Sequence, residues 1–271
     1  MDNQGYYIRY GALSYELDQE HTDHGLTDTE MRLLTECLDG VRNAVHLCCG
    51  AGRHVAAFEN VGIASCGIDI SPELLQKGRE SVIPRQPTGQ GPRLVLGDVV
   101  SLPFKARTTD CVTLLGNSLC LFPEHLCAEI LAEVARILVS EGLFIIDLPD
   151  PAYLQAHQKG TTSTSQTIHT QTLGVVQWTW VRHADAERCM MVSEECVQPL
   201  KDEKPLTKTL RFEFHLYEPQ KACVMSETFG LHLERVLECE DLSGRYKGML
   251  RKRNFLLLRS TKDGSPRDTV P

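Results

Sequence analysis

Short apolar runs alternate with amphipathic stretches over the first half of the chain. The runs predict buried strands at residues 41–49, 63–70, 93–96, 110–115 and 142–148. Apolar residues at helical spacing predict helices at 54–60, 71–82 and 126–139. Strand and helix alternate five times, which predicts right-handed crossovers and a doubly wound, mostly parallel sheet.

The second half has longer strand-like runs joined by charged turns. Runs at 173–181, 189–197 and 206–217 predict an antiparallel β-meander that forms a small second sheet. Runs at 231–239 and 254–259 are expected to return as two closing strands of the main sheet. The expected units are an N-terminal flap and helix (1–40), an α/β core (41–160), an antiparallel β insertion (161–218), closing strands (219–260) and a polar tail (261–271).

Charge and composition narrow the possible partners. The net charge of −8 argues against a nucleic-acid-binding surface, because phosphate contacts need clustered cations. The only dense basic run is Arg251-Lys252-Arg253, which we expect to be a solvated turn. No apolar stretch approaches the roughly 20 residues needed to cross a bilayer. Eleven scattered cysteines without C-x-x-C spacing predict small buried side chains in a reducing cytoplasm.

A glycine-rich turn after the first strand is the main chemical signal. Gly50 and Gly52 let a backbone approach a ligand closely, and Asp69 at the end of the second strand can accept hydrogen bonds from both hydroxyls of a ribose. These three residues suit a nicotinamide dinucleotide as well as S-adenosylmethionine. Val55 stands where the dinucleotide pattern has its third glycine, and Asp98 after the third strand can accept from an adenine amino group. Both features favour S-adenosylmethionine, while a nicotinamide-dependent oxidoreductase stays an alternative.

Five segments resemble, in order and at the right spacing, the class I S-adenosylmethionine-dependent methyltransferases. They are HLCCGAGRH, CGIDISPELL, LGDVVSLPF, TDCVTLLGNSLCLF and ILAEVARILVSEGLFIIDLPDP. The resemblance runs from about Tyr10 to Arg259, and it is to the small-molecule branch with a β-rich insertion after the fifth strand. It implies a Rossmann-like, doubly wound, mostly parallel seven-stranded sheet with an inserted antiparallel β-meander. It also implies in-line methyl transfer from S-adenosyl-L-methionine to a nitrogen or oxygen nucleophile of a small molecule.

The resemblance assigns cofactor-binding roles residue by residue. Asp69 and Ile70 would hold the ribose, Asp98 and Val99 the adenine, and Gly50, Gly52 and Leu115 the methionine portion, with Tyr10 near the methionine carboxylate. The sequence departs from the family at two positions that belong to the same site. His46 replaces the acid that approaches the methionine ammonium, and Cys48 replaces the first glycine. These departures leave open a methyltransferase-like binding module without turnover.

Candidates for acceptor chemistry are fewer. Methyl transfer needs a base only for a hydroxyl or a protonated amine. Asn117 and Ser118, just past the fourth strand, are placed to orient an acceptor or to form an ordinary turn. His21 and His24 lie on the N-terminal segment, as bases or as surface residues, and without a third ligand nearby they predict no metal site. The sequence does not indicate the acceptor's identity or the oligomeric state.

Overall fold

A seven-stranded sheet, called sheet A, forms the centre of the protein in the computed structural model, which describes residues 3–17, 24–82, 93–157, 160–170, 173–185, 189–200, 206–240 and 251–261. Its strands are β1 (Asn43–Leu47), β2 (Ala64–Asp69), β3 (Arg93–Leu96), β4 (Thr109–Leu114), β5 (Leu138–Pro149), β10 (Leu231–Glu240) and β11 (Lys252–Ser260). The order is β10-β11-β5-β4-β1-β2-β3. Strands β1 to β5 pair in parallel, while β11 runs antiparallel to β5 and β10 to β11.

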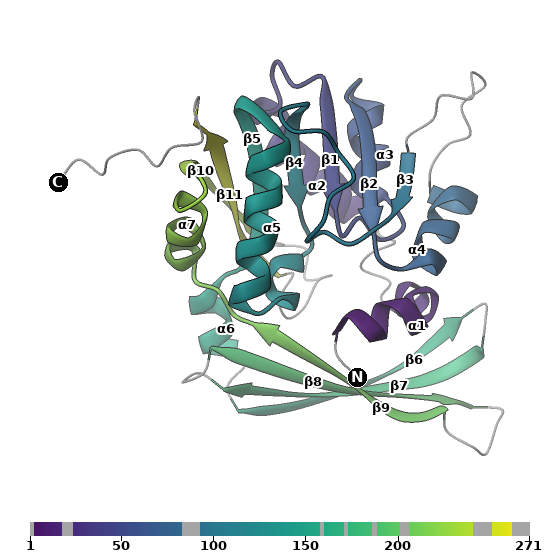
Figure 1. The fold of residues 1–271 in the computed structure, drawn as a ribbon. Helices are drawn as coiled ribbons and strands as arrows, with labels where there is room; N and C mark the ends of the chain where they lie inside the picture. Colours follow the sequence, from purple (N-terminus) through teal and green to yellow (C-terminus); the bar gives the residue numbers. More distant parts are fainter. Residues whose placement is uncertain are drawn as a thin grey trace.

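Helices cover both faces of sheet A (Figure 1). The helical elements are α1 (Asn3–Leu17), α2 (His24–Leu34), η2 (Thr35–Cys37), α3 (Arg53–Asn60), α4 (Pro72–Lys77), η3 (Gly78–Val82), η4 (Ser118–Leu121), α5 (Glu124–Ile137), α6 (Pro151–His157) and α7 (Pro219–Glu227). Helices α5 and α7 pack on one face through one apolar core, and α2 and α3 pack on the other through a second. Burial on both faces explains why the strand sequences are apolar runs.

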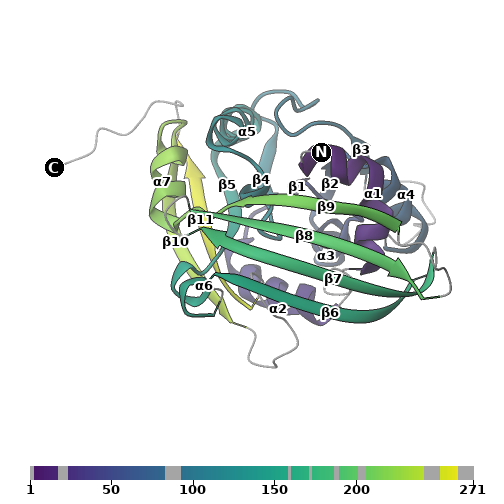
Figure 2. The same cartoon turned by 90° about the horizontal axis from the view of Figure 1, so that it is seen from below.

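A second, four-stranded antiparallel sheet, called sheet B, lies beyond the carboxyl ends of the parallel strands (Figures 1 and 2). It contains β6 (Thr161–Thr170), β7 (Gly174–Asp185), β8 (Met190–Pro199) and β9 (Leu206–His215) in sequence order. Helix α1 lies between the two sheets, where Tyr6 packs on Phe212 with ring centroids 4.0 Å apart. The region where the parallel strands end is therefore covered by α1 and sheet B.

The predicted fold class is confirmed, with differences in three places. Strand β6 was not predicted, because its ten residues, TTSTSQTIHT, are almost all polar. Helices α1, α6 and α7 were not predicted either, and the predicted loop at 84–92 lies outside the described residues. The expectation of a solvated turn at Arg251-Lys252-Arg253 is wrong for Arg253, which is completely buried in β11.

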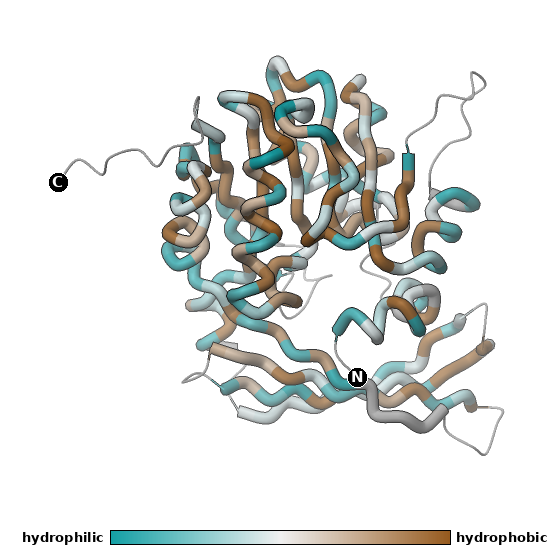
Figure 3. Tube along the Cα trace, viewed as in Figure 1, coloured by the Kyte–Doolittle hydropathy of each residue, from teal (hydrophilic) through white to brown (hydrophobic). Residues whose placement is uncertain are grey.

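Hydropathy along the backbone follows this division of the two sheets. The strands of sheet A are drawn mostly in brown, whereas teal, white and brown alternate along sheet B (Figure 3). An antiparallel sheet with one face on the core and one in water needs such alternation. Sheet A supplies a rigid buried frame, and the residues at its carboxyl edge are candidates for function.

Candidate functional site

The glycine turn, residues 48–52, changes the direction of the chain between β1 and α3 with three left-handed residues. Cys48, Gly50 and Gly52 have φ values of 50°, 56° and 86°. Glycine adopts this conformation freely, whereas an L-residue such as Cys48 loses about 1–2 kcal/mol there. A Cβ placed on Gly50 would meet no atom within 4 Å, so the space over this backbone is open. Such an open, side-chain-free turn suits the close approach of a ligand.

Asp69 is fixed beside this turn at the end of β2. Its Oδ2 accepts the Gly50 N–H at 2.7 Å, and its Oδ1 accepts the Ser71 N–H at 2.9 Å. Burial raises the pKa of this carboxyl group, and the backbone hydrogen bonds act in the opposite direction. A carboxylate has about four acceptor positions, so each oxygen keeps one for a further donor such as a ribose hydroxyl.

Asp98 lies one strand further along and is contacted by helix α1. Its Oδ2 accepts from the Gln4 side chain at 3.0 Å, and its Oδ1 accepts the Val100 N–H at 3.2 Å. Tyr10 stands at a kink in the same helix, with φ −131° and ψ 17°, and its ring centroid is 5.9 Å from that of Tyr6. Tyr10 thus lies on the same helix as Gln4, the residue that contacts Asp98.

His46 is buried under the turn, on the α2 and α3 face of sheet A. Its Nδ1 is 2.8 Å from the Thr113 hydroxyl, and its ring meets Phe58 edge-on at 4.7 Å. Burial lowers the pKa of His46 to about 3, and His54 adds to the shift. The imidazole is therefore neutral at physiological pH, which leaves one ring nitrogen as a hydrogen-bond acceptor.

The thiols of the turn are also uncharged. Burial raises the pKa values of Cys48 and Cys49 well above the ordinary range, and the Asp69 carboxylate adds to both shifts. A protonated thiol is a poor nucleophile. Neither cysteine is therefore activated as a nucleophile.

The loop at residues 115–118 follows β4 on the neighbouring strand of sheet A, and we call it the acceptor loop after the role expected for Asn117. Asn117 is left-handed, with φ 58° and ψ 22°, and its N–H donates to Asp147 Oδ1 at 2.9 Å. The Ser118 hydroxyl donates to the Leu115 carbonyl at 2.7 Å. The structure brings Asn117 and Leu115 to the carboxyl edge that carries the glycine turn. His21 lies outside the described residues, and of His24 only the backbone, at the start of α2, is described.

Comparison with known proteins identifies the part of the chain that carries this geometry. Residues 44–142 match the family model described as a methyltransferase domain. The matched residues contain the glycine turn, Asp69, Asp98 and the acceptor loop.

Individual proteins agree with this assignment. A demethylmenaquinone methyltransferase of Staphylococcus aureus is 34% identical over 112 residues, or 39% of this chain and 44% of the relative. The chain spans about half the length of the curated relatives it matches. Two solved structures share the fold: an S-adenosylmethionine-dependent methyltransferase from Clostridium acetobutylicum (16% identity, TM-score 0.69, 94% of this chain and 99% of that chain) and the CcbJ methyltransferase from Streptomyces caelestis (19%, 0.66, 86% and 89%). The predicted class I methyltransferase fold with its β insertion is confirmed.

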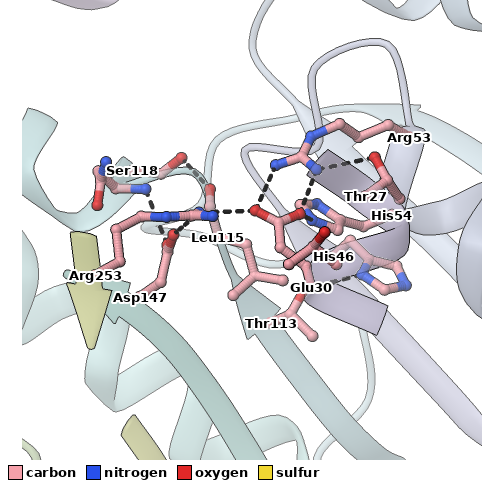
Figure 4. Close-up of polar contacts among 12 residues, drawn as sticks. Thr27, Glu30, His46, Arg53, His54, Thr113, Leu115, Ser118, Asp147 and Arg253 are labelled. Carbon is pink, nitrogen blue, oxygen red and sulfur yellow. Dashed lines mark hydrogen bonds and ion pairs between the residues drawn. The ribbon is translucent and has the colours of Figure 1, made fainter. Parts of the chain in front are cut away.

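A buried ion cluster beside the glycine turn was missed by the sequence analysis. It consists of Glu30, Arg53, His54, Asp147 and Arg253 (Figure 4). Burial alone would raise the pKa of Glu30, but Arg53, His54 and Arg253 outweigh it and hold the pKa well below its usual range. Arg253 shares a strand face with the apolar Phe255 and Leu257. That periodicity was the available signal that Arg253 points into the core.

Two further observations concern metal ions and membranes. Among the described residues, no group of three or more His, Cys, Asp or Glu side chains is arranged to hold a metal ion. Within the same ranges, no helix combines the length and the apolar composition needed to cross a membrane.

Proposed function

We propose that this chain transfers the methyl group of S-adenosyl-L-methionine to a nitrogen or oxygen nucleophile of a small-molecule acceptor by in-line displacement. The carrying observation is the Asp69 carboxylate, which Gly50 and Ser71 hold rigidly beside an open, left-handed glycine turn. A fixed hydrogen-bond acceptor beside a backbone without side chains suits a ribose and the methionine chain next to it. The methyltransferase family match over residues 44–142 supports the same proposal.

The described residues suit each part of this cofactor. Asp69 and Ile70 would hold the ribose, Asp98 and Val99 the adenine, and Leu115 with the glycine turn the methionine portion. Tyr10, on α1, would contact the methionine carboxylate, and His46, beneath the turn, would approach the methionine ammonium. In this role Gln4 would meet the adenine edge together with Asp98, because it already bonds that carboxylate.

The cofactor brings a methyl group already activated on a sulfonium, so the protein needs no nucleophile of its own. Its task is to hold donor and acceptor in line and to exclude water, which can supply roughly 7–11 kcal/mol of the barrier. The neutral thiols of Cys48 and Cys49 leave the methyl group to the acceptor. Asn117, in the acceptor loop, would orient that acceptor.

Several features support a small acceptor and a cytoplasmic setting. The curated relative is named for demethylmenaquinone, a small molecule. The net charge of −8 disfavours a nucleic acid as the acceptor. All eleven cysteines are free, as expected where thiols stay reduced.

Calorimetric titration with S-adenosylhomocysteine, the demethylated product, tests the proposal. We expect binding to the natural protein and at least a roughly hundredfold loss with Asp69→Ala, because two hydrogen bonds to a charged group are removed. Asp110→Ala is the matched control, since Asp110 also accepts backbone N–H groups, of Arg42 and Asn43, but at the opposite edge of sheet A.

Three outcomes separate the alternatives. Absence of heat with S-adenosylmethionine and with S-adenosylhomocysteine would overturn the proposal. Tight binding of a nicotinamide dinucleotide instead would favour an oxidoreductase. Cofactor binding without transfer of a labelled methyl group to any metabolite fraction would favour a binding module without turnover.

A further inference from the structure

Three charged side chains from distant parts of the chain meet inside the protein beside the candidate site. Arg253 Nη1 donates to Glu30 Oε1 at 2.7 Å and to Asp147 Oδ2 at 2.6 Å, and all three side chains are completely buried. They come from α2, β5 and β11, so 223 residues separate Glu30 from Arg253. Burying such charges costs several kcal/mol each before pairing, and apolar side chains would often give equal or greater stability. Stability alone therefore does not explain why these charges are kept in the core.

One end of the cluster reaches the glycine turn. Glu30 Oε2 is 2.8 Å from His54 Nε2 and also contacts Arg53. Arg53 and His54 are the first two residues of α3 and directly follow Gly52. Arg53 also donates to the Thr27 hydroxyl at 3.0 Å, which makes a second link from the start of α3 to α2. Glu30 thus fixes Arg53 and His54, the two residues that directly follow the turn.

The other end reaches the acceptor loop. While Asp147 Oδ2 is paired with Arg253, its Oδ1 accepts the N–H of Asn117 at 2.9 Å. Asn117 holds a left-handed backbone, which asparagine adopts more readily than other residues with a side chain, and Asp147 accepts the N–H of this turn. The position of Asp147 therefore determines the position of this loop.

The charges of the cluster are balanced. Arg53 and Arg253 oppose Glu30 and Asp147, while burial and the neighbouring Arg53 lower the pKa of His54 and favour its neutral form. Figure 4 shows the unbroken series of contacts from Arg53 through Glu30 and Arg253 to Asp147. Removal of one member leaves an unbalanced buried charge, so its effect should reach both ends.

We propose that Arg253, with Glu30 and Asp147, is a positioning residue that sets the distance between the acceptor loop and the glycine turn. This inference rests on the proposed function, since it assigns the two segments to acceptor and cofactor. Its consequence is that a substitution in β11, remote in sequence from both segments, alters both together. A cluster that served only stability would alter neither until the whole protein unfolds.

The test compares Arg253→Met with Leu257→Ala in the natural full chain. Leu257 lies on the same face of the same strand and is buried among apolar side chains, so its truncation destabilises β11 without touching the cluster. Amide hydrogen exchange is measured for peptides covering residues 48–52 and 115–118, and calorimetry measures S-adenosylhomocysteine binding. For Arg253→Met we expect faster exchange in both peptides and roughly tenfold weaker binding. For Leu257→Ala we expect a lower melting temperature with both peptides unchanged.

Two further variants keep the proposal open to refutation if Arg253→Met does not fold. Arg253→Lys should recover part of the lost protection, because both carboxylates bond the same nitrogen and one ammonium can serve them. Glu30→Gln, at the other end, should speed exchange at residues 115–118 without a direct contact to them. Equal exchange in Arg253→Met, Glu30→Gln and Leu257→Ala would overturn the proposal. Failure of the natural protein to bind the cofactor would instead overturn the proposed function, while the exchange results would still report on the coupling.

Discussion

Sheet A and sheet B differ in how deeply they bury their side chains. Residues 142–149 of β5 are buried without interruption, whereas β8 alternates between buried and partly exposed positions. Buried polar side chains of sheet A have fixed partners inside the protein, as His46 has in Thr113 near the carboxyl ends of the parallel strands. Sheet B also buries polar residues such as Ser193 and Glu195, but many of its polar side chains are exposed: Ser165 and Thr179 bond each other in contact with solvent.

Buried and exposed polar residues differ in how strongly they constrain the structure around them. A buried polar group must be paired inside the protein, so each one in sheet A constrains its neighbours. Water can replace a partner on the outer face of sheet B, and a polar residue there constrains little. The candidate functional residues therefore lie at the carboxyl edge of sheet A.

The largest expected effect concerns the core of sheet A. Phe144→Ala should lower the free energy of unfolding by about 3–5 kcal/mol, because it leaves a cavity at a fully buried position of β5. Urea unfolding followed by circular dichroism measures it. Leu96→Ala, at the exposed end of β3, is the control and should change the value by less than about 0.5 kcal/mol. A loss under about 1 kcal/mol for Phe144→Ala would contradict the description of sheet A as the rigid frame.

The same contrast explains what the sequence could predict of the fold. Parallel strands buried on both faces leave apolar runs, so β1 to β5 were predicted to within a few residues. The edge strand β6 carries only Ile168 as a large apolar residue, and pairing with β7 makes it a strand. Its conformation depends on a neighbour in space, which local pattern cannot supply.

The candidate site divides in the same way. The glycine turn, Asp69 and Asp98 are local signals, because each stands at a strand end beside glycine or a helix start. Glu30 and Arg253 form an ion pair although 223 residues separate them, so no local pattern indicates the pairing. Arg253 was assigned to a solvated turn with Arg251 and Lys252, although it shares a strand face with apolar residues; the pairing of β11 with β5 buries it.

The second prediction concerns pH and the buried imidazole of sheet A. The pKa of His46 is about 3 in the folded protein against 6.5 when exposed, so the unfolded chain binds the extra proton between these values. The contribution of neutral His46 to the free energy of unfolding is fully present above pH 6.5. It is lost as the pH falls from 6.5 towards 3. Between pH 7.5 and 5.5 the free energy of unfolding should fall by about 1–2 kcal/mol. Urea unfolding at the two pH values measures the change.

The non-titrating variant His46→Gln separates this contribution from the rest. It should remove part of the decrease, while the part due to His54, whose pKa is also lowered by burial, remains. An unchanged pH dependence in His46→Gln would mean that the imidazole is not buried in its neutral form.

The third prediction concerns the contact between α1 and the start of α4. A Cβ on Gly11 would lie 2.2 Å from the Ser71 hydroxyl, and that hydroxyl accepts the Leu74 N–H as the N-cap of α4. Gly11→Ala should therefore cost about 1 kcal/mol through the disturbed cap. It should also speed amide exchange in α1 more than in sheet A. Gly40→Ala, where a Cβ meets no atom but φ is 76°, controls for backbone strain alone. Slower exchange in α1 of Gly11→Ala would contradict this packing.

The smallest effect is expected on the outer face of sheet B, with a matched hydroxyl in sheet A as the comparison. Ser165→Ala removes the 2.8 Å bond to Thr179, but water can replace it, so the free energy of unfolding should change by less than about 0.5 kcal/mol. Thr113→Ala removes a bond of the same length to His46 in the dry interior, where the imidazole loses its partner, and should cost about 1–3 kcal/mol. Urea unfolding of both variants at pH 7.5 gives the two values. Equal losses would mean that the outer face of sheet B is covered in solution, since a hydroxyl in contact with water cannot be as costly to remove as one sealed beneath the glycine turn.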